Sequence, residues 1–278
     1  MALIRVDADQ CKKDGICIET CPLAILEFKT KDALPTMIRG GEILCIHCGH
    51  CVAVCPHHAM NHAAMQSGDC PPIRKELSIS SEQAEQFLRS RRSIRVYKKT
   101  TVDRNLLTRL IHTARHAPSG HNTQPVEWIV IYDRDQVRDL IKLVIDWMRQ
   151  MVKENSPMAQ MFHMARLIQS YEAGSDRIFR GAPHLIIAHC PQALRTSQSS
   201  TILALSYLEL MAPALGLGTC WAGYFMAASN LYPPLIHALK LPQGHAVFGA
   251  MMVGYPKYRY HRLPLRKQPA IEWRTGRT

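Results

Sequence analysis

Seven of the ten cysteines lie between residues 11 and 55 of a 278-residue chain, and this crowding constrains the N-terminal fold more than any other feature. The first ten residues carry Arg5, Asp7 and Asp9 and lack the apolar run of a secretion signal. We therefore expect a cytoplasmic protein without a disulfide framework. Cysteines clustered in such a chain bind metal or carry out redox chemistry. The N-terminal region is thus predicted to be a metal or redox unit.

The cysteines follow an internal repeat. Residues 11–26 read CKKDGICIETCPLAIL and residues 45–60 read CIHCGHCVAVCPHHAM, so three cysteines, a glycine and a proline recur 34 residues apart. A duplication of this kind predicts two similar half-sites related by pseudo-symmetry.

The second copy has the spacing C-x2-C-x2-C-x3-C-P, which is typical of bacterial iron–sulfur proteins, where the fourth cysteine ligates the other of two clusters. Structural zinc prefers paired C-x2-C or Cys/His sets, and this run fits that arrangement poorly. Applying the crossed pattern to both copies gives one ligand set of Cys45, Cys48, Cys51 and Cys21, and a second set of Cys11, Asp14, Cys17 and Cys55. This region, over residues 1–62, resembles the two-cluster bacterial ferredoxins.

Asp14 stands where the first copy should carry its second cysteine. We favour an Asp14 that ligates iron, giving a 4Fe–4S cluster with one exchangeable corner. The alternative is an Asp14 that does not ligate, which leaves a 3Fe–4S cluster. A carboxylate is a harder ligand than a thiolate, so iron at this corner is expected to be held less tightly.

The composition shifts after the repeat, and we predict an iron–sulfur domain over 1–66, a linker over 67–79 and a larger domain over 80–278. Turn-forming residues crowd the linker, and Ser80 or Ser81 can cap the helix that follows. Apolar periodicity predicts helices over 106–116, 137–152 and 199–215, and strands over 128–132, 185–188 and 247–253. These elements indicate an α+β or α/β domain with a central sheet. The apolar stretch 201–228 is broken by proline and glycines, so we interpret it as a core or interface helix followed by a loop, without a membrane span.

Four segments of the larger domain carry candidate chemistry. Arginines crowd residues 89–98, RSRRSIRVYK, and can cradle an anion, although a solvated basic turn would read the same. Small polar residues fill 117–125, APSGHNTQP, and glycines fill 214–225, ALGLGTCWAGYF, which we expect to be a loop that lets backbone approach a flat ligand. A basic tail, GYPKYRYHRLPLRK, spans 254–267. The methionines of 148–164 are expected to pack as core or to line a substrate cavity.

The order of these segments resembles the FMN-dependent nitroreductase family over about residues 82–270, and the whole chain resembles its ferredoxin-fused members. The resemblance implies an α+β sandwich and a homodimer with FMN at the interface. It assigns Arg91, Arg92, Ser93 and Arg95 to the phosphate, ribityl chain and pyrimidine edge of FMN. It assigns Pro118, Ser119, Gly120, Asn122 and Gln124 to a loop supplied by the partner subunit. It assigns Trp221, Ala222 and Gly223 to backbone facing flavin N5, and Arg266 or Lys267 to the phosphate.

The resemblance implies an oxidoreductase in which FMN carries the chemistry and no catalytic side chain is demanded. We predict that two clusters relay electrons to FMN, which reduces a small electrophilic acceptor of the nitroaromatic type. The alternatives are reductive dehalogenation or enone reduction, and a non-enzymatic electron carrier or redox sensor. Either ferredoxin or NAD(P)H can be the donor. The net charge of +12 does not indicate nucleic-acid binding, because the basic residues are dispersed and no nucleic-acid-binding motif accompanies them.

Overall fold

The computed structural model describes residues 2–276, which form two compact units. The cysteine unit comprises the residues up to Ile79 together with Pro118–Pro125, and the sheet unit comprises Ser80–Ala117 and the chain from Val126 onward. The segment Pro118–Pro125 therefore belongs by its contacts to the cysteine unit, although both of its neighbours in sequence belong to the sheet unit.

Short elements surround the cysteines in the cysteine unit. Two antiparallel pairs form its sheets, β1 (Ile4–Val6) with β4 (Met60–His62) and β2 (Leu26–Glu27) with β3 (Thr36–Met37). Its helices are α1 (Ile16–Glu19), α2 (Gly41–Leu44) and α3 (His50–Val54), with short 3-10 helices at Ser67–Asp69, Lys75–Leu77 and Gly120–Asn122. A small apolar core of Cys17, Leu26, Val52 and Met60 holds these pieces together.

The internal repeat is present in the backbone as well as in the sequence. Three pairs of residues 34 positions apart share left-handed φ angles: Lys13 and His47 (57° and 52°), Gly15 and Gly49 (77° and 73°), and Ala24 and His58 (49° and 53°). Gly15 and Gly49 immediately precede α1 and α3. Glycine adopts this conformation without the steric cost that a Cβ imposes, which explains its place in both copies.

A four-stranded antiparallel sheet in the order β5-β6-β8-β7 forms the centre of the sheet unit. Its strands are β5 (Glu127–Ile131), β6 (His184–Pro191), β7 (Gly218–Trp221) and β8 (His245–Gly254). Three of them lie where short apolar runs predict them. The fourth corrects the predicted Gly-rich loop, because residues 218–221 pair with β8 along the edge of the sheet.

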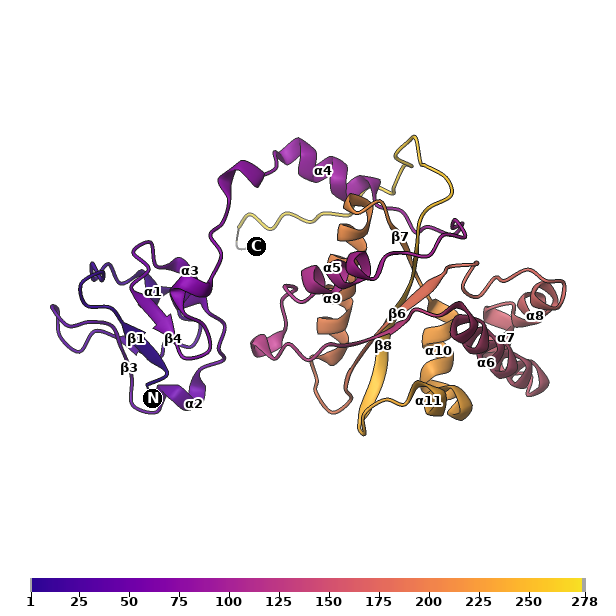
Figure 1. Cartoon of the computed structure of the whole chain (residues 1–278), viewed down its shortest axis with the longest axis horizontal. Helices are drawn as coiled ribbons and strands as arrows, with labels where there is room; N and C mark the ends of the chain where they lie inside the picture. Colours follow the sequence, from indigo (N-terminus) through magenta and orange to yellow (C-terminus); the bar gives the residue numbers. More distant parts are fainter. Residues whose placement is uncertain (1, 277–278) are drawn as a thin grey trace. The chain divides into compact units, whose positions relative to one another are not determined.

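Helices cover both faces of this sheet (Figure 1). On one face lie α5 (Arg104–Ala114) and α9 (Ser197–Ala214), and on the other lie α6 (Arg134–Lys153), α10 (Gly223–Leu231) and α11 (Pro233–Leu239). Successive side chains of β6 point to opposite faces of the sheet, and both faces are apolar. Leu185 and Ile187 pack in one core cluster, and Ile186 and Ala188 pack in the other. The unit is therefore an α+β sandwich, as the sequence predicts.

The remaining helices attach to this sandwich. The first, α4 (Ser81–Ser90), is capped by Ser80, one of the two serines expected to do so. The hydroxyl of Ser80 accepts from the amide of Gln83 in a capping box. The others, α7 (Pro157–Met161) and α8 (Met164–Glu172), pack against α6. Within the methionine-rich segment Met148 and Met164 are fully buried, which confirms a core role for these two residues. Within residues 2–276, none of the helices combines the length and hydropathy that a membrane crossing requires.

Candidate functional site

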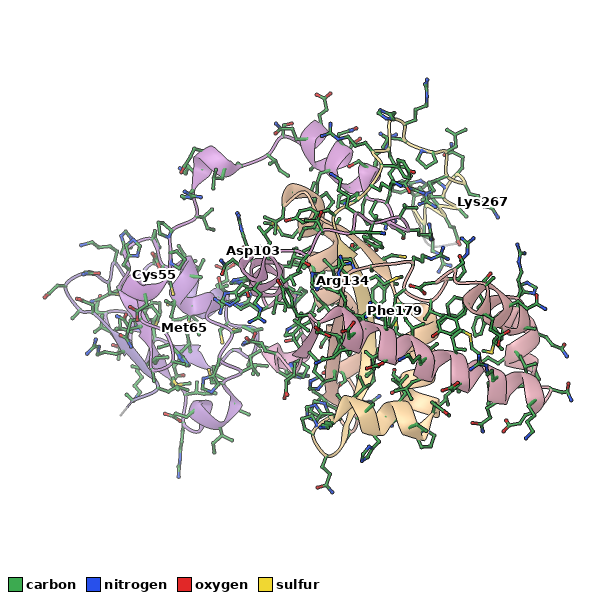
Figure 2. All side chains as sticks on the ribbon, turned by 45° about the vertical axis from the view of Figure 1, so that its right-hand side comes forward. Cys55, Met65, Asp103, Arg134, Phe179 and Lys267 are labelled. Atoms are coloured by element: carbon green, nitrogen blue, oxygen red, sulfur yellow. The ribbon has the colours of Figure 1, made fainter. Side chains whose placement is uncertain are left out.

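Two cavities in the cysteine unit are lined by thiols from both copies of the repeat (Figure 2 labels Cys55). The first cavity is lined by Cys21 of the first copy and by Cys45, Cys48 and Cys51 of the second. The second is lined by Cys55 of the second copy and by Cys11, Asp14 and Cys17 of the first. The structure thus brings together the two crossed ligand sets that the repeat predicts.

Two of the thiols in these cavities, Cys17 and Cys51, have pKa values raised above that of an ordinary cysteine. All ten cysteines of the chain carry free thiols. Burial raises the pKa of Cys17 to about 11, with further contributions from Cys55, Asp14 and Cys11. Burial likewise raises the pKa of Cys51. Since thiolates are the metal-binding form, a group of high positive charge must supply the energy of deprotonation, which is the behaviour of thiolate metal sites. Four converging sulfur or carboxylate donors fit an iron–sulfur cluster in each cavity.

Asp14 lies at the second cavity with its carboxylate partly open to solvent. One oxygen, Oδ1, accepts from the amide of Ile16 at 3.2 Å, and the other, Oδ2, lies 3.7 Å from Nε2 of His57. The hydrogen bond fixes the carboxylate at the N-terminal end of α1, beside Cys17. An oxygen ligand can therefore take the corner that Cys48 occupies in the other copy.

His62 is a site residue that none of the predicted ligand sets includes. It is buried at the end of β4, and its Nε2 lies 3.8 Å from Sγ of Cys45. Its Nδ1 accepts from the amide of Ala64 at 3.0 Å, so Nε2 carries the proton and donates to the sulfur. The repeat places Phe28 at the equivalent position in the first copy, 34 residues earlier. The donor is therefore specific to the first cavity, and its signal in the sequence was this exchange of Phe for His.

A cationic cavity of about 530 Å³ lies in the sheet unit, between β7, the end of α9 and the start of the C-terminal tail. Its positively charged lining consists of Arg92, Lys98, Lys257 and Arg259. The tail is held there by backbone pairing, since the amide of Lys257 donates to the carbonyl of Val96 at 3.0 Å. Such a charge excess in a cavity of this size fits a phosphorylated organic ligand.

Arg91 forms an ion pair with Glu209 of the cationic cavity. Its guanidinium donates to Oε1 of Glu209 on α9 at 2.8 Å, and the two side chains are 28% and 10% exposed. The pair neutralises the acidic group of the cationic cavity's wall. Arg92, the next residue, remains at the cavity and its guanidinium lies 5.9 Å from the ring centre of Tyr260.

The segment after Arg92 runs along β7. The amide of Ile94 donates to the carbonyl of Thr219 at 2.8 Å, and a Cβ on Gly218 would lie 2.4 Å from Ile94, so only glycine allows this approach. Burial raises the pKa of the Cys220 thiol, and the nearby Arg95 and Ser93 oppose the rise. Arg95 itself is exposed.

Trp221, Ala222 and Gly223 join the end of β7 to the start of α10. The amide of Ala222 donates to the carbonyl of Ala250 at 2.9 Å. That N–H is therefore already satisfied within the protein, and Gly223, at the first position of α10, is the better candidate to face a flavin.

The polar loop Pro118–Gln124 lies in the cysteine unit. The side-chain nitrogen of Asn122 donates to the carbonyls of Ile46 and His47 at 3.1 and 3.0 Å, between Cys45 and Cys48. Ser119 accepts from the amide of Gln124 at 3.0 Å, and this closes the loop that contains Gly120. The predicted flavin loop therefore contacts the binding loop of the first cavity.

The basic residues of the C-terminal tail fall into two groups, those that line the cationic cavity and those that do not. Arg266 and Lys267 are exposed on its extended part, where Figure 2 labels Lys267. Lys257 and Arg259 reach the cationic cavity instead. Sequence reasoning notes all of these residues as a basic tail, but the tail is irregular and carries no periodicity that would select among them.

Two family models match this chain. A model of the "Nitroreductase family" matches residues 88–255, and a model of the "4Fe-4S binding domain" matches residues 42–61. A Thermus thermophilus protein described as "NADH dehydrogenase" is 30% identical over 200 residues, covering 66% of this chain and 92% of that protein.

Two solved structures share the fold. A nitroreductase with bound FMN from Desulfitobacterium hafniense has a TM-score of 0.54 at 22% identity, covering 68% of this chain and 96% of its own. A nitroreductase with bound FMN from Bacteroides fragilis has a TM-score of 0.52 at 19% identity, covering 69% of this chain and 96% of its own.

Proposed function

Because the chain belongs to the nitroreductase family, we propose that it is an FMN- and iron–sulfur-dependent reductase that relays electrons through two clusters to the flavin and reduces a small electrophilic acceptor. The observation that carries the relay is the pair of thiol-lined cavities, each built from both copies of the repeat. When bound, the clusters carry electrons singly, while FMN collects two and delivers them together.

The residues of this chain hold the groups and set their surroundings. Cys21, Cys45, Cys48 and Cys51 hold one cluster, and Cys11, Asp14, Cys17 and Cys55 hold the other. Arg92, Lys257 and Arg259 bind the phosphate of FMN in the cationic cavity.

The first cavity is the exit point of the relay. Asn122 lies in the loop that resembles the flavin loop of this family. Its side-chain nitrogen donates to the carbonyls of Ile46 and His47, between Cys45 and Cys48. Donors and acceptors of single electrons work best when packed elements hold them at a fixed separation, and this double hydrogen bond supplies one such fixed contact.

The flavin is proposed to lie at a homodimer interface on α9. Ile202, Leu203 and Tyr207 are exposed on this helix, whereas its other side packs on α5 and the sheet. A second copy covering these side chains would bury apolar surface that otherwise faces water. Light scattering on the purified protein should give twice the mass of the chain, and a monomer would contradict the dimer without touching the relay.

The relay is tested by turnover of a nitroaromatic acceptor driven by reduced ferredoxin, with NADH and NADPH as the other donors. Cys51→Ala should abolish ferredoxin-driven turnover while FMN stays bound, because it removes a ligand of the exit cluster. Cys70→Ala is the matched control, since Cys70 lines neither cavity. Unchanged turnover in Cys51→Ala would disprove the relay. FMN reduction without turnover of nitro, halogenated or enone acceptors would favour an electron carrier.

Asp14 is tested by iron analysis and EPR. Asp14→Ala should convert the second cluster to a three-iron form, and Asp14→Cys should give a four-iron cluster that resists loss of its corner iron. A stable four-iron cluster in Asp14→Ala would show that the carboxylate is not a ligand.

A further inference from the structure

Three side chains with metal-binding atoms meet at one end of the central sheet, within the sheet unit. Glu127 begins β5, His189 lies near the end of β6, and His245 begins β8. The strands are hydrogen-bonded neighbours in the order β5-β6-β8, and Glu127 pairs directly with His189. His245 pairs with Pro191, two residues beyond His189, so its side chain lies diagonally across from that of His189.

The ligand atoms of these three side chains are close enough to share one ion. One atom from each lies within 4.8 Å of the others, and the Nδ1 atoms of the two histidines are 3.0 Å apart. Two nitrogens bound tetrahedrally to one zinc ion at about 2.0–2.1 Å lie about 3.4 Å from each other. A small rotation of either ring would therefore open the pair to a metal.

The surroundings suit a metal that is reached from solvent. His189 is 3% exposed and the side chain of His245 is 12% exposed, whereas the carboxylate of Glu127 is 58% exposed. The two imidazoles are thus fixed within the fold, and the carboxylate marks the side from which an ion arrives. Without an ion, one imidazole must donate its Nδ1 proton to the other, which accounts for the 3.0 Å contact as a simple hydrogen bond.

We propose that Glu127, His189 and His245 form a binding site for a divalent transition-metal ion of the zinc type, with water as the fourth ligand. Two imidazoles and one carboxylate are borderline ligands that suit zinc, whereas magnesium and calcium require oxygen donors throughout. Because the three ligands sit on three adjacent strands, the ion would tie β5, β6 and β8 together at the end of the sheet. None of these three residues lines either of the two thiol-lined cavities or the cationic cavity.

The test uses zinc alone, added to the full-length protein carrying its clusters and flavin. Metal analysis after gel filtration should find one additional zinc per chain, and X-ray absorption should show only nitrogen and oxygen ligands at about 2.0–2.1 Å. A sulfur shell at about 2.3 Å would place the zinc on cysteines and overturn the proposal.

Three variants complete the test. Glu127→Ala changes an exposed residue, so it should fold normally and still weaken zinc binding at least tenfold. His189→Gln combined with His245→Gln should lose the zinc, whereas His237→Gln, an exposed histidine on α11, should retain it. Zinc should raise the melting temperature of the wild type and of His237→Gln but not of Glu127→Ala. Retention of full affinity in Glu127→Ala would show that the carboxylate is not a ligand, and retention of the zinc in the double histidine variant would place the zinc elsewhere. Either result would overturn the proposal.

Discussion

His62→Phe is expected to lower the reduction potential of one cluster and leave the other unchanged. The Nε2–H of His62 donates to Sγ of Cys45, and a hydrogen bond to a cluster sulfur favours the more negative, reduced state. The substitution copies Phe28 from the other half of the repeat, so the new side chain suits a position of this backbone. It is expected to remove the donor without disturbing the fold.

The size of the shift follows from the geometry. Hydrogen bonds to charged groups contribute about 1.5–3 kcal/mol, and the long 3.8 Å contact places this one near or below the lower limit. If about 1 kcal/mol distinguishes the two oxidation states, the one-electron potential should fall by about 40 mV, since a tenfold change in equilibrium corresponds to about 59 mV.

The assay is an anaerobic potentiometric titration followed by EPR, in which the second cluster serves as the internal standard. His62→Gln keeps an N–H at a similar reach and should restore most of the wild-type value. An unchanged midpoint in His62→Phe, or equal shifts of both clusters, would refute the assignment of His62 as the donor.

Three further predictions concern the sheet unit and can be followed by tryptophan fluorescence, since all four tryptophans lie in it. Arg91→Met should cost about 2–4 kcal/mol of unfolding free energy, because it leaves the carboxylate of Glu209 buried and unpaired. The double variant Arg91→Met with Glu209→Met should recover most of that loss. Additive losses would show that the pair is not coupled. Burial lowers the pKa of His184, so the folded chain binds fewer protons than the unfolded chain. Stability should therefore fall as the pH drops below about 6.5. His184→Asn should flatten this dependence of stability on pH, and an unchanged slope would contradict the role of His184. Gly254→Ala should cost about 1–3 kcal/mol of unfolding free energy, because the new Cβ would lie 2.6 Å from Pro183 and 2.8 Å from Tyr97. Gly276→Ala is the control and should be neutral, because a Cβ there meets no neighbouring atom. Equal stabilities of the two variants would argue against tight packing at Gly254.

Local patterns in the sequence predicted the regular elements better than their arrangement. The strands β5, β6 and β8 follow from their short apolar runs, and the start of α4 follows from a capping serine, which the structure shows to be Ser80. The edge strand β7 escaped prediction because Gly-Thr-Cys-Trp has neither alternation nor length. Its first residue, Gly218, packs against Ile94, and sequence patterns do not reveal a contact between residues so far apart in the chain.

The same contrast holds for the sites. The repeat, together with the crossed ligand pattern of two-cluster bacterial ferredoxins, predicted which cysteines line each cavity. The partner of Arg91 was not predictable, since 118 residues separate it from Glu209 and no pattern links them. Selecting Lys257 and Arg259 from the basic tail likewise needed the backbone pairing with the segment near Val96.

Because the two cysteine copies share their left-handed residues, each copy can serve as a control for the other. Lys13 and His47, Gly15 and Gly49, and Ala24 and His58 give both copies the same backbone path. Residues 11–26 and 45–60 differ at eleven of sixteen positions. Two differences concern the cavities directly: Asp14 against Cys48 at a ligand position and, just beyond these segments, Phe28 against His62 at the hydrogen-bond donor. Exchanging those two pairs, one at a time, would measure the separate effects of a ligand and of a hydrogen bond within a single chain.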